Sequence, residues 1–221
     1  MNKYTDPILK RLALDKNMLE ELCAISDLIE AKALNGNDYL PPTEYEIVYH
    51  VRSIIGINGD KSPIFGDRHL AKITLPSGYP MVSPPSCYMI TDLWHPNIRS
   101  SGNLKGHICI NAQVLGTWHT LDLLILQIGE MLQYKNYHAL KIQPYPEDPV
   151  VATWVQEYAE PNGIVDKSKH ISLDNRPLTK PSNNWINTRK HNKINILNIR
   201  IKSVQMDFQI ESKKTIVIKP K

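Results

Sequence analysis

The sequence is poor in cysteine, and its cysteines form no recognisable disulfide or metal pattern. Cys23, Cys87 and Cys109 are odd in number and widely spaced among 221 residues, which argues against a disulfide framework and fits a reducing compartment. No C-x-x-C pair is present, so a structural zinc site has no cysteine basis. The histidines near the third cysteine match no known set of ligand spacings either. We therefore expect no bound metal.

Long apolar runs are also missing. The residues up to Asp6 lack the apolar core of a secretion signal. The most apolar stretch, residues 121–132, contains three polar side chains and is too short to cross a bilayer. The glycine and proline contents do not indicate global disorder, and no internal repeat is visible. These absences predict a cytoplasmic protein with one sizeable hydrophobic core and no membrane partner.

An excess of basic over acidic charge is found only at the C-terminal end of the chain. Residues 180–221 hold ten lysines or arginines against two acidic residues, a net charge of +8, so residues 1–179 carry −4. This tail lacks the interleaved exposed aromatic residues of many nucleic-acid interfaces, and a nucleic-acid partner is not favoured. Its alternating apolar residues instead predict a small β-rich extension with a lysine-studded edge that resists aggregation.

An N-terminal helix followed by antiparallel strands is predicted. Asp6-Pro7 is a typical helix start, and apolar spacings of three, four and seven predict a helix that runs through Ile29 to a stop near Gly36. Beyond it the apolar period changes to two, which indicates a four-stranded antiparallel meander. Its clearest strands are residues 45–57, with Ile55 on the same face as Tyr45, then 69–75 and 87–91.

Two more helices are predicted after an irregular segment, residues 94–120. Leu121–Leu132 reads as a buried helix, and Asp148-Pro149 opens another whose apolar stripe includes Val150. A helix, a meander, a loop and helices in this order indicate an α+β fold, not a parallel βαβ one. The expected divisions are a main domain at 1–160, a linker at 161–185 and a basic β-rich extension at 186–221.

Several motifs follow one another in the middle of the chain. They are Tyr79-Pro80 with Pro84-Pro85, His95-Pro96-Asn97-Ile98, Gly106-His107-Ile108-Cys109-Ile110-Asn111, Trp118, and Tyr145-Pro146-Glu147-Asp148-Pro149. Singly they are weak, but their order, with strands before and helices after, resembles the ubiquitin-conjugating enzyme family over about residues 6–158. The resemblance implies a UBC-like α+β fold with an active-site loop. It also implies an enzyme that carries a ubiquitin-like modifier as a thioester.

The resemblance assigns roles to residues around Cys109. A thiolate forms thioesters that are reactive enough to pass an acyl group to an amine, so Cys109 is the expected nucleophile. The Asn97 amide is expected to stabilise the oxyanion. Asp148 is expected to orient the incoming lysine, although a role limited to capping the next helix stays open. The residues expected to support the site structurally are His95, Pro96 and Trp118.

The resemblance also implies partners. An activating enzyme is expected to dock on the first helix at Lys10 and Arg11, and it consumes the ATP, so this chain itself needs no cofactor. The other partners are the modifier and a target protein with an acceptor amine. Pro63 and Ile64 match a loop with which family members meet ligases. The residues after Trp118 lack the proline common in the family, so the need for a ligase stays open.

The chain departs from the family pattern at two places near the cysteine. Cys109 lies 14 residues after His95, a longer spacing than is common in the family, which places an insertion within Arg99–Lys105. A second insertion, Tyr134–Tyr145, precedes Asp148. These departures make the chain similar to divergent conjugating enzymes of bacterial ubiquitin-like operons, some of which serve antiphage defence.

Two other functions remain open. A non-catalytic UBC-fold variant would only hold a modifier, but such variants typically lack the cysteine that is present here. A cysteine hydrolase would pair Cys109 with one of the histidines 95, 107 and 119. The sequence shows neither a helix start at the cysteine nor an orienting partner, and His107 is expected to face away from Cys109 if this segment is extended.

Overall fold

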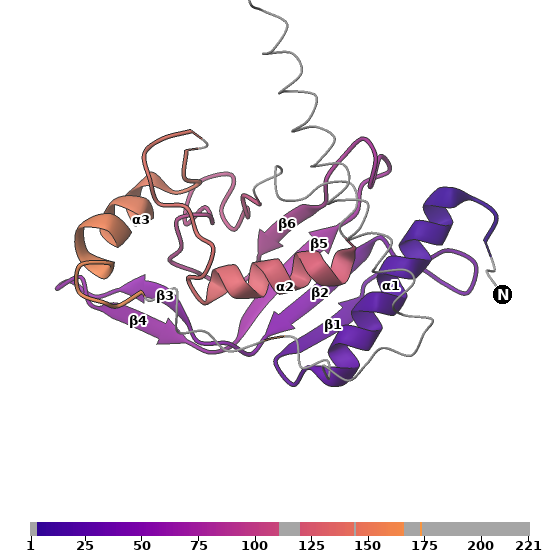
Figure 1. The fold of residues 1–221 in the computed structure, drawn as a ribbon, viewed down its shortest axis with the longest axis horizontal. Helices are drawn as coiled ribbons and strands as arrows, with labels where there is room; N and C mark the ends of the chain where they lie inside the picture. Colours follow the sequence, from indigo (N-terminus) through magenta and orange to yellow (C-terminus); the bar gives the residue numbers. More distant parts are fainter. Residues whose placement is uncertain (1–3, 111–119, 144, 166–172, 174–221) are drawn as a thin grey trace, which may run out of the picture. The chain divides into compact units, whose positions relative to one another are not determined.

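The computed structural model describes residues 4–110, 120–143, 145–165 and 173, and these contain two antiparallel β-sheets. The larger sheet has the strand order β1-β2-β5-β6, and the smaller one pairs β3 with β4. The strands are β1 Ile29–Ala33, β2 Glu44–Tyr49, β3 Ser53–Ile57, β4 Pro63–Gly66, β5 His69–Thr74 and β6 Ser86–Met89. The predicted α+β fold with an N-terminal helix and an antiparallel sheet is confirmed (Figure 1).

The register of the larger sheet follows the period-two pattern of its central strand. Ile47 of β2 lies opposite Ala31 of β1 and Ala71 of β5. Tyr45, Ile47 and Tyr49 are all buried, because alternate residues of a strand share a face and this face meets the core. The prediction of one continuous strand to Ile57 is wrong. The chain breaks after β2 and re-pairs as the separate β3–β4 hairpin.

The prediction that Ile55 lies on the same face as the buried Tyr45 is also wrong. The register of β3 against β4 shifts between Ile54 and Gly56, and such a bulge turns the following side chains to the other face. Ile54 is therefore 2% exposed and Ile55 37% exposed. Pro63 and Ile64, predicted as loop residues that meet a ligase, form the first half of β4.

Helix α1 spans Pro7–Ile25 and begins as predicted, with the Asp6 side chain accepting a hydrogen bond from the Ile8 N–H at 2.7 Å. Its predicted end near Gly36 is wrong, because the chain turns extended at Ser26 and Ile29 begins β1. Gly36, with φ of +96°, lies instead in the β1–β2 connection. Gly36 marks the connection between two strands and not a helix end, because a left-handed residue can serve in either position.

Helix α2, Leu121–Leu132, lies across the larger sheet and closes the main core (Figure 1). Two polar contacts fix its position on the strands. The Tyr49 hydroxyl donates to the Ile125 carbonyl at 3.1 Å, and the Ser53 hydroxyl donates to the Leu132 carbonyl at 2.6 Å. The middle of the helix is thus tied to β2 of the larger sheet, and its C-terminal end is tied to β3 of the smaller one.

Helix α3, Pro149–Trp154, continues into a π-helical turn, η1, Val155–Ala159. The Asp148 side chain caps it as predicted, accepting from the N–H groups of Val150 and Val151. Val150 itself is 67% exposed, so its predicted place in the apolar stripe is wrong. Trp154 is buried in a second, smaller core and donates its indole N–H to the Lys61 carbonyl at 3.0 Å, which joins α3 to the β3–β4 hairpin.

Some predictions fall outside the described residues. These are the site role of Trp118, the β-rich extension at 186–221 and most of the linker at 161–185. Among the helices that the structure does describe, none is both long and apolar enough to span a membrane.

Candidate active site

Two short extended segments form the centre of the site. Ile98 and Ile108 make an antiparallel bridge, the Cys109 N–H donates to the Asn97 carbonyl at 2.9 Å, and the Arg99 N–H donates to the His107 carbonyl at 3.0 Å. The two isoleucines are buried in the core. Alternate residues of an extended segment share a face, so the residues on either side of them face outward together. This outer face holds Asn97, Arg99, His107 and Cys109.

The prediction that His107 faces away from Cys109 is therefore wrong. Residues two apart on an extended chain lie on the same side, and the buried Ile108 between them marks the other side. The His107 ring packs edge-on against Tyr88, with ring centroids 5.3 Å apart. His107 and Arg99 thus form one rung of the ladder, and Cys109 and Asn97 form the next.

The predicted insertion at Arg99–Lys105 is a compact turn that closes this ladder. The Gly106 N–H donates to the Arg99 carbonyl at 2.8 Å, and the Gly106 carbonyl accepts from the Met89 N–H at 2.7 Å. Gly106 has φ of +85°, and a Cβ placed there would lie 2.2 Å from the Met89 carbonyl oxygen. Only glycine fits this backbone position, which fixes the strand that carries Cys109 against β6.

Cys109 differs from the other two cysteines in its setting. Burial, together with the negative charge of nearby Glu147, raises the pKa of the half-buried Cys109 thiol above its usual value. Cys87 is buried in β6, where burial raises its pKa to about 12. Cys23 is half-buried on α1 beside β1. Cys109 is the only one of the three that lies on the ladder with the His95-Pro96-Asn97 motif.

The second insertion holds the Asn97 side chain. The His138 N–H donates to Asn97 Oδ1 at 2.8 Å, so residues 134–143 lie next to the site. Because the oxygen end of the amide is bonded to this backbone, its nitrogen end is the one that can donate to a developing oxyanion. The insertion therefore gives Asn97 a fixed orientation.

His95 lies beneath the ladder as a structural group. Its Nδ1 accepts from the Asn97 N–H at 3.1 Å, and its ring packs edge-on against Tyr134 with centroids 4.7 Å apart. Complete burial lowers the pKa of His95 to about 3. The ring is therefore neutral at physiological pH and has no access to solvent. Pro96 links the motif to the segment just before α3, because the Pro96 carbonyl accepts a hydrogen bond from the Asp148 N–H at 2.9 Å.

The Asp148 carboxylate is fully engaged. One oxygen accepts from the N–H groups of Val150 and Val151, and the other accepts from the Ser100 N–H at 2.9 Å and its hydroxyl at 2.5 Å. The residue is 3% exposed. Burial tends to raise the pKa of this carboxyl, but the hydrogen bonds from Ser100 and the helix outweigh it and lower the pKa below its usual value. Asp148 thus pins the Arg99–Lys105 turn to α3.

Glu147 is the site residue that the sequence analysis missed. Its Oε1 lies 3.4 Å from Arg99 Nε and 3.2 Å from His107 Nδ1, and its side chain is 14% exposed. It therefore lies over the rung next to Cys109. The available signal was the pair of adjacent acidic residues in the Glu147-Asp148-Pro149 motif, from which the family resemblance selected only the second.

The two residues predicted to meet an activating enzyme differ in their setting. Lys10 is exposed on α1. Arg11 is mostly buried, and its Nε donates to Asp15 Oδ2 at 2.9 Å while an Nη donates to the Tyr79 hydroxyl at 2.9 Å. Asp15 is 0% exposed and also accepts from the Tyr79 hydroxyl and from the Leu121 N–H. Arg11 therefore belongs to a buried cluster that joins α1 to the start of α2.

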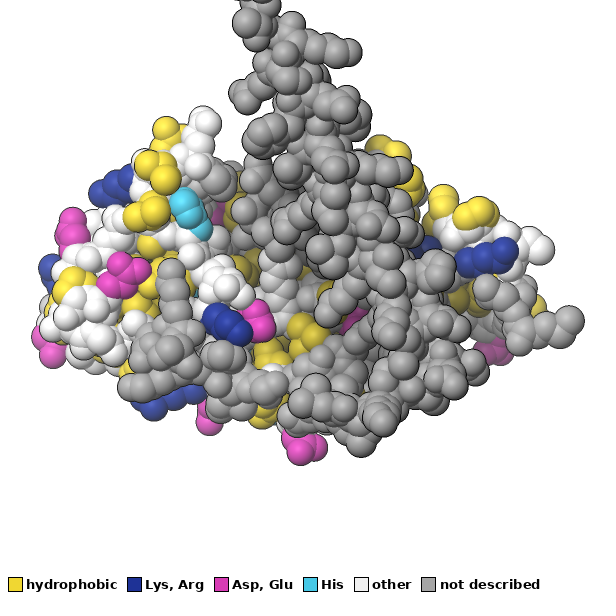
Figure 2. Space-filling model, in the orientation of Figure 1, with side chains coloured by type: hydrophobic (Ala, Val, Ile, Leu, Met, Phe, Trp, Pro, Cys, Tyr) yellow, Lys and Arg dark blue, Asp and Glu magenta, His cyan; other side chains and the backbone are white. Residues whose placement is uncertain are grey.

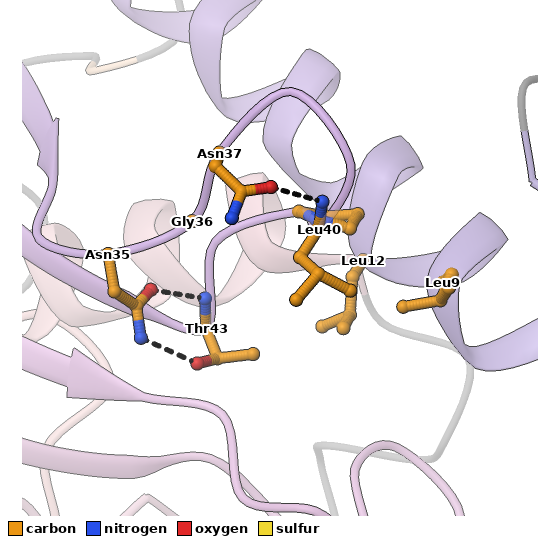
Figure 3. Close-up of a pocket in the computed structure, with 8 residues that line it drawn as sticks. Leu9, Leu12, Asn35, Gly36, Asn37, Leu40 and Thr43 are labelled. Carbon is orange, nitrogen blue, oxygen red and sulfur yellow. Dashed lines mark hydrogen bonds between the residues drawn. The ribbon is translucent and has the colours of Figure 1, made fainter.

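A small hollow lies between α1 and the β1–β2 connection (Figure 3). It has a volume of about 240 Å³. Asn35 and Asn37 shape its rim through side-chain hydrogen bonds to Thr43 and Leu40. Its apolar lining residues are Leu9, Leu12, Leu40 and Pro41.

Apolar side chains are also exposed beside the site. Figure 2 shows hydrophobic surface gathered at the α3 end of the molecule. The second insertion contributes Leu140, Ile142 and Tyr145, each more than half exposed.

Over the described part of the chain, no three His, Cys, Asp or Glu residues are grouped so that they could hold a metal ion.

Comparison with known proteins gives one family. The family described as "Ubiquitin-conjugating enzyme" matches residues 51–163, just over half of the chain. Ubiquitin-conjugating enzyme E2 27 of Arabidopsis thaliana is 34% identical over 101 residues, 44% of this chain and 45% of that protein. Ubiquitin-conjugating enzyme E2 T of Danio rerio is 30% identical over 105 residues, which are 46% of this chain and 48% of that protein. Ubiquitin-conjugating enzyme E2 T of Xenopus laevis is 31% identical over 105 residues, which are 46% of this chain and 49% of that protein. The chain spans about half the length of these relatives.

Proposed function

The chain belongs to the family of ubiquitin-conjugating enzymes, and we propose that it accepts a ubiquitin-like modifier from an activating enzyme as a thioester on Cys109. It then passes the modifier to an amine of a target protein, most often a lysine. The observation that carries this proposal is the ladder that sets Cys109 directly opposite Asn97 on one outer face. Both residues lie within the segment that matches the family.

The chemistry follows from these two side chains. In the first step the Cys109 sulfur attacks the thioester carbonyl held by the activating enzyme, and the modifier moves to Cys109 while the other thiol leaves. In the second step an amine attacks the new thioester carbonyl. Both steps develop negative charge on the carbonyl oxygen, and the Asn97 amide nitrogen, oriented by His138, is the donor that stabilises it.

The raised pKa of Cys109 suits a carrier cysteine. A thiol that stays protonated reacts slowly with oxidants and stray electrophiles. Reaction is then favoured when a docked partner presents an activated carbonyl at this position.

We place the docking of the activating enzyme on the α1 surface. Exposed Lys10 offers a cationic contact, and the neighbouring hollow, lined by Leu9, Leu12 and Leu40, offers an apolar one. Arg11 supports this surface from inside through Asp15. Lys10→Glu is expected to slow loading of Cys109 without changing the discharge of the loaded protein, which single-turnover assays separate.

Loading with ubiquitin, a ubiquitin-activating enzyme and ATP tests the proposal. The wild type is expected to give an adduct that a thiol reductant removes, and Cys109→Ala is expected to abolish it. Cys23→Ala is the matched control, because Cys23 is also half-buried but lies on α1, and it should load normally. Loading that survives Cys109→Ala would contradict the proposal.

The same assay separates the two other functions. A non-catalytic variant would bind the modifier equally with or without Cys109, and a hydrolase would release modifier from a conjugate without ATP. Ligase contact at Pro63 and Ile64, and a place in a bacterial operon, stay predictions.

A further inference from the structure

Two carboxylates stand side by side at the site, and they are not equivalent. Asp148 accepts four hydrogen bonds and is almost completely buried. A carboxylate oxygen has about two acceptor positions, so each Asp148 oxygen is saturated by its two donors. An incoming amine would have to displace Ser100 or uncap α3 to reach this group.

Glu147 is held more loosely and nearer the reacting surface. Both of its contacts are to Oε1, at 3.4 Å from Arg99 Nε and 3.2 Å from His107 Nδ1. The Arg99 distance is long for a charge-assisted hydrogen bond, and His107 Nδ1, although close, makes no hydrogen bond to Glu147. Among the described residues no cation is paired with its Oε2, and the side chain keeps some exposure to solvent.

The ladder fixes how far Glu147 lies from the cysteine. Arg99 and His107 form the rung beside the one formed by Asn97 and Cys109, and successive same-face residues of an extended strand are about 7 Å apart. A carboxylate over one rung is therefore within reach of a group that approaches the other. The effect of the Glu147 charge on Cys109 agrees with this separation.

We propose that Glu147, not Asp148, is the positioning residue that receives the acceptor amine at Cys109, with Arg99 paired to its carboxylate. This inference rests on the proposed function. It gives the preferred acceptor as a primary amine that is a cation in solution, such as a lysine side chain. Asp148 shapes the site by holding the Arg99–Lys105 turn.

The sign of the charge identifies the step in which Glu147 acts. A negative charge beside a free thiol disfavours the thiolate, so Glu147 does not activate Cys109 for loading. Once Cys109 is a neutral thioester this penalty disappears, and the same charge attracts an ammonium group.

The step balances as an ordinary aminolysis. The bound ammonium gives one proton to solvent, and its nitrogen attacks the thioester carbonyl to form the C–N bond. The C–S bond then breaks, and the remaining surplus proton of the nitrogen goes to the leaving Cys109 thiolate. The products are an amide and the free thiol.

The test compares two nucleophiles on the same loaded protein. Wild type, Glu147→Gln and the control Glu157→Gln, an exposed residue of η1, are loaded with ubiquitin on Cys109. They are then discharged with free lysine, which is cationic, or with hydroxylamine, which is mostly neutral at pH 7.5. Glu147→Gln is expected to slow discharge to lysine by about tenfold, the effect of one favourable charge contact in a partly exposed site. Discharge to hydroxylamine, and every rate of Glu157→Gln, should stay within about twofold of wild type.

The dependence of the lysine discharge rate on ionic strength provides a second measurement. A merely structural role of Glu147 would not change this dependence. Raising the ionic strength should slow lysine discharge of the wild type and leave Glu147→Gln unchanged, because screening acts only where the charge remains. Equal slowing of both nucleophiles, or no slowing of lysine discharge, would overturn the inference.

Loading itself separates this inference from the proposed function. If the activating enzyme does not load Cys109, the failure belongs to the proposed function with ubiquitin as modifier. Cys109 is then loaded chemically with a ubiquitin thioester of mercaptoethanesulfonate, and the comparison of nucleophiles proceeds. An unchanged lysine rate in Glu147→Gln after chemical loading would still contradict the role of Glu147.

Discussion

Two arginine–carboxylate pairs among the described residues differ in burial and in how tightly the carboxylate is held. Arg11 and Asp15 lie on the buried side of α1, where the carboxylate is completely buried and also accepts from a tyrosine hydroxyl and a backbone N–H. Arg99 and Glu147 lie beside Cys109, with a longer contact and partial exposure. A saturated, buried carboxylate holds parts of the fold together, whereas a loosely held one remains able to bind something else.

The difference also separates two regions of the molecule. The α1–α2–sheet region is joined by the Asp15 cluster and a continuous hydrophobic core. The ladder that carries Cys109 is supported from below by His95 and from the side by Asp148, and its outer face has polar groups with spare capacity. Substitutions in the first region should act on stability, and those on the outer face should act on chemistry.

Removal of the Asp15 carboxylate should have the largest effect. Asp15→Ala leaves the mostly buried Arg11 guanidinium and the Leu121 N–H without their acceptor, so we expect a loss of about 3 to 5 kcal/mol in the free energy of unfolding. Urea denaturation followed by circular dichroism measures it. Glu21→Ala, exposed on the same helix, is the control and should change stability by less than about 0.5 kcal/mol. An Asp15→Ala variant as stable as wild type would remove the contrast between the two pairs.

Gly106→Ala tests the backbone that supports Cys109. The new Cβ would combine a left-handed φ with a clash against the Met89 carbonyl, so we expect a loss of about 3 kcal/mol. Gly102→Ala is a matched control, since Gly102 has φ of +77° but open space around its Cβ position, and it should cost about 1 kcal/mol. Thermal melts compare the two variants. Equal losses would mean that the contact with β6 does not fix the ladder.

His95 should make stability depend on pH. In the unfolded chain a histidine takes up a proton below about pH 6.5, whereas the folded ring resists protonation until about pH 3. The folded pKa is the lower one, so stability falls as pH falls through this window, by about 2 kcal/mol between pH 6.5 and pH 5. Urea titrations at both values measure the difference in wild type and in His95→Asn, which should lose less. A wild-type stability that is flat over this range would contradict the neutral, buried ring.

Glu147→Gln should have the smallest effect on stability and a clear effect on the thiol. The residue is partly exposed and loosely paired, so we expect a change below about 1 kcal/mol. Removal of its charge lowers the pKa of Cys109, so the cysteine should be alkylated faster by iodoacetamide at pH 7.5. Peptide mass spectrometry follows Cys109 and uses Cys23 as the internal reference. A slower alkylation of Cys109 would place the carboxylate elsewhere.

Local signals predicted the elements that they fully determine. Asp6-Pro7 and Asp148-Pro149 mark helix starts through short-range capping, and both helices begin there. The end of α1 was missed because the apolar period continues into β1, and only tertiary pairing with β2 converts Ile29 into a strand residue. The bulge at Ile54 was missed for a similar reason, since the partner strand β4 sets the register.

The candidate site also contains features that the sequence predicts and features that it does not. Motif order selected Cys109 and Asn97 as site residues, and it marked the two insertions as unusual. It did not reveal that one insertion holds the Asn97 amide through His138, or that the other saturates Asp148 through Ser100. Those contacts link residues 41 and 48 positions apart, and no local pattern encodes them. The contact of Glu147 with Arg99, on which its proposed role rests, is also between residues 48 positions apart.

The most direct test of the central claim is the chemical nature of the adduct on residue 109. Cys109→Ser places a hydroxyl at the same position, so loading with ubiquitin should give an oxygen ester in place of a thioester. We predict that the wild-type adduct is cleaved by dithiothreitol, that the serine adduct survives dithiothreitol, and that mild alkali cleaves both. Peptide mapping of the serine adduct should place ubiquitin on residue 109. A wild-type adduct that resists dithiothreitol, or an adduct mapped to Cys23 or Cys87, would contradict the account.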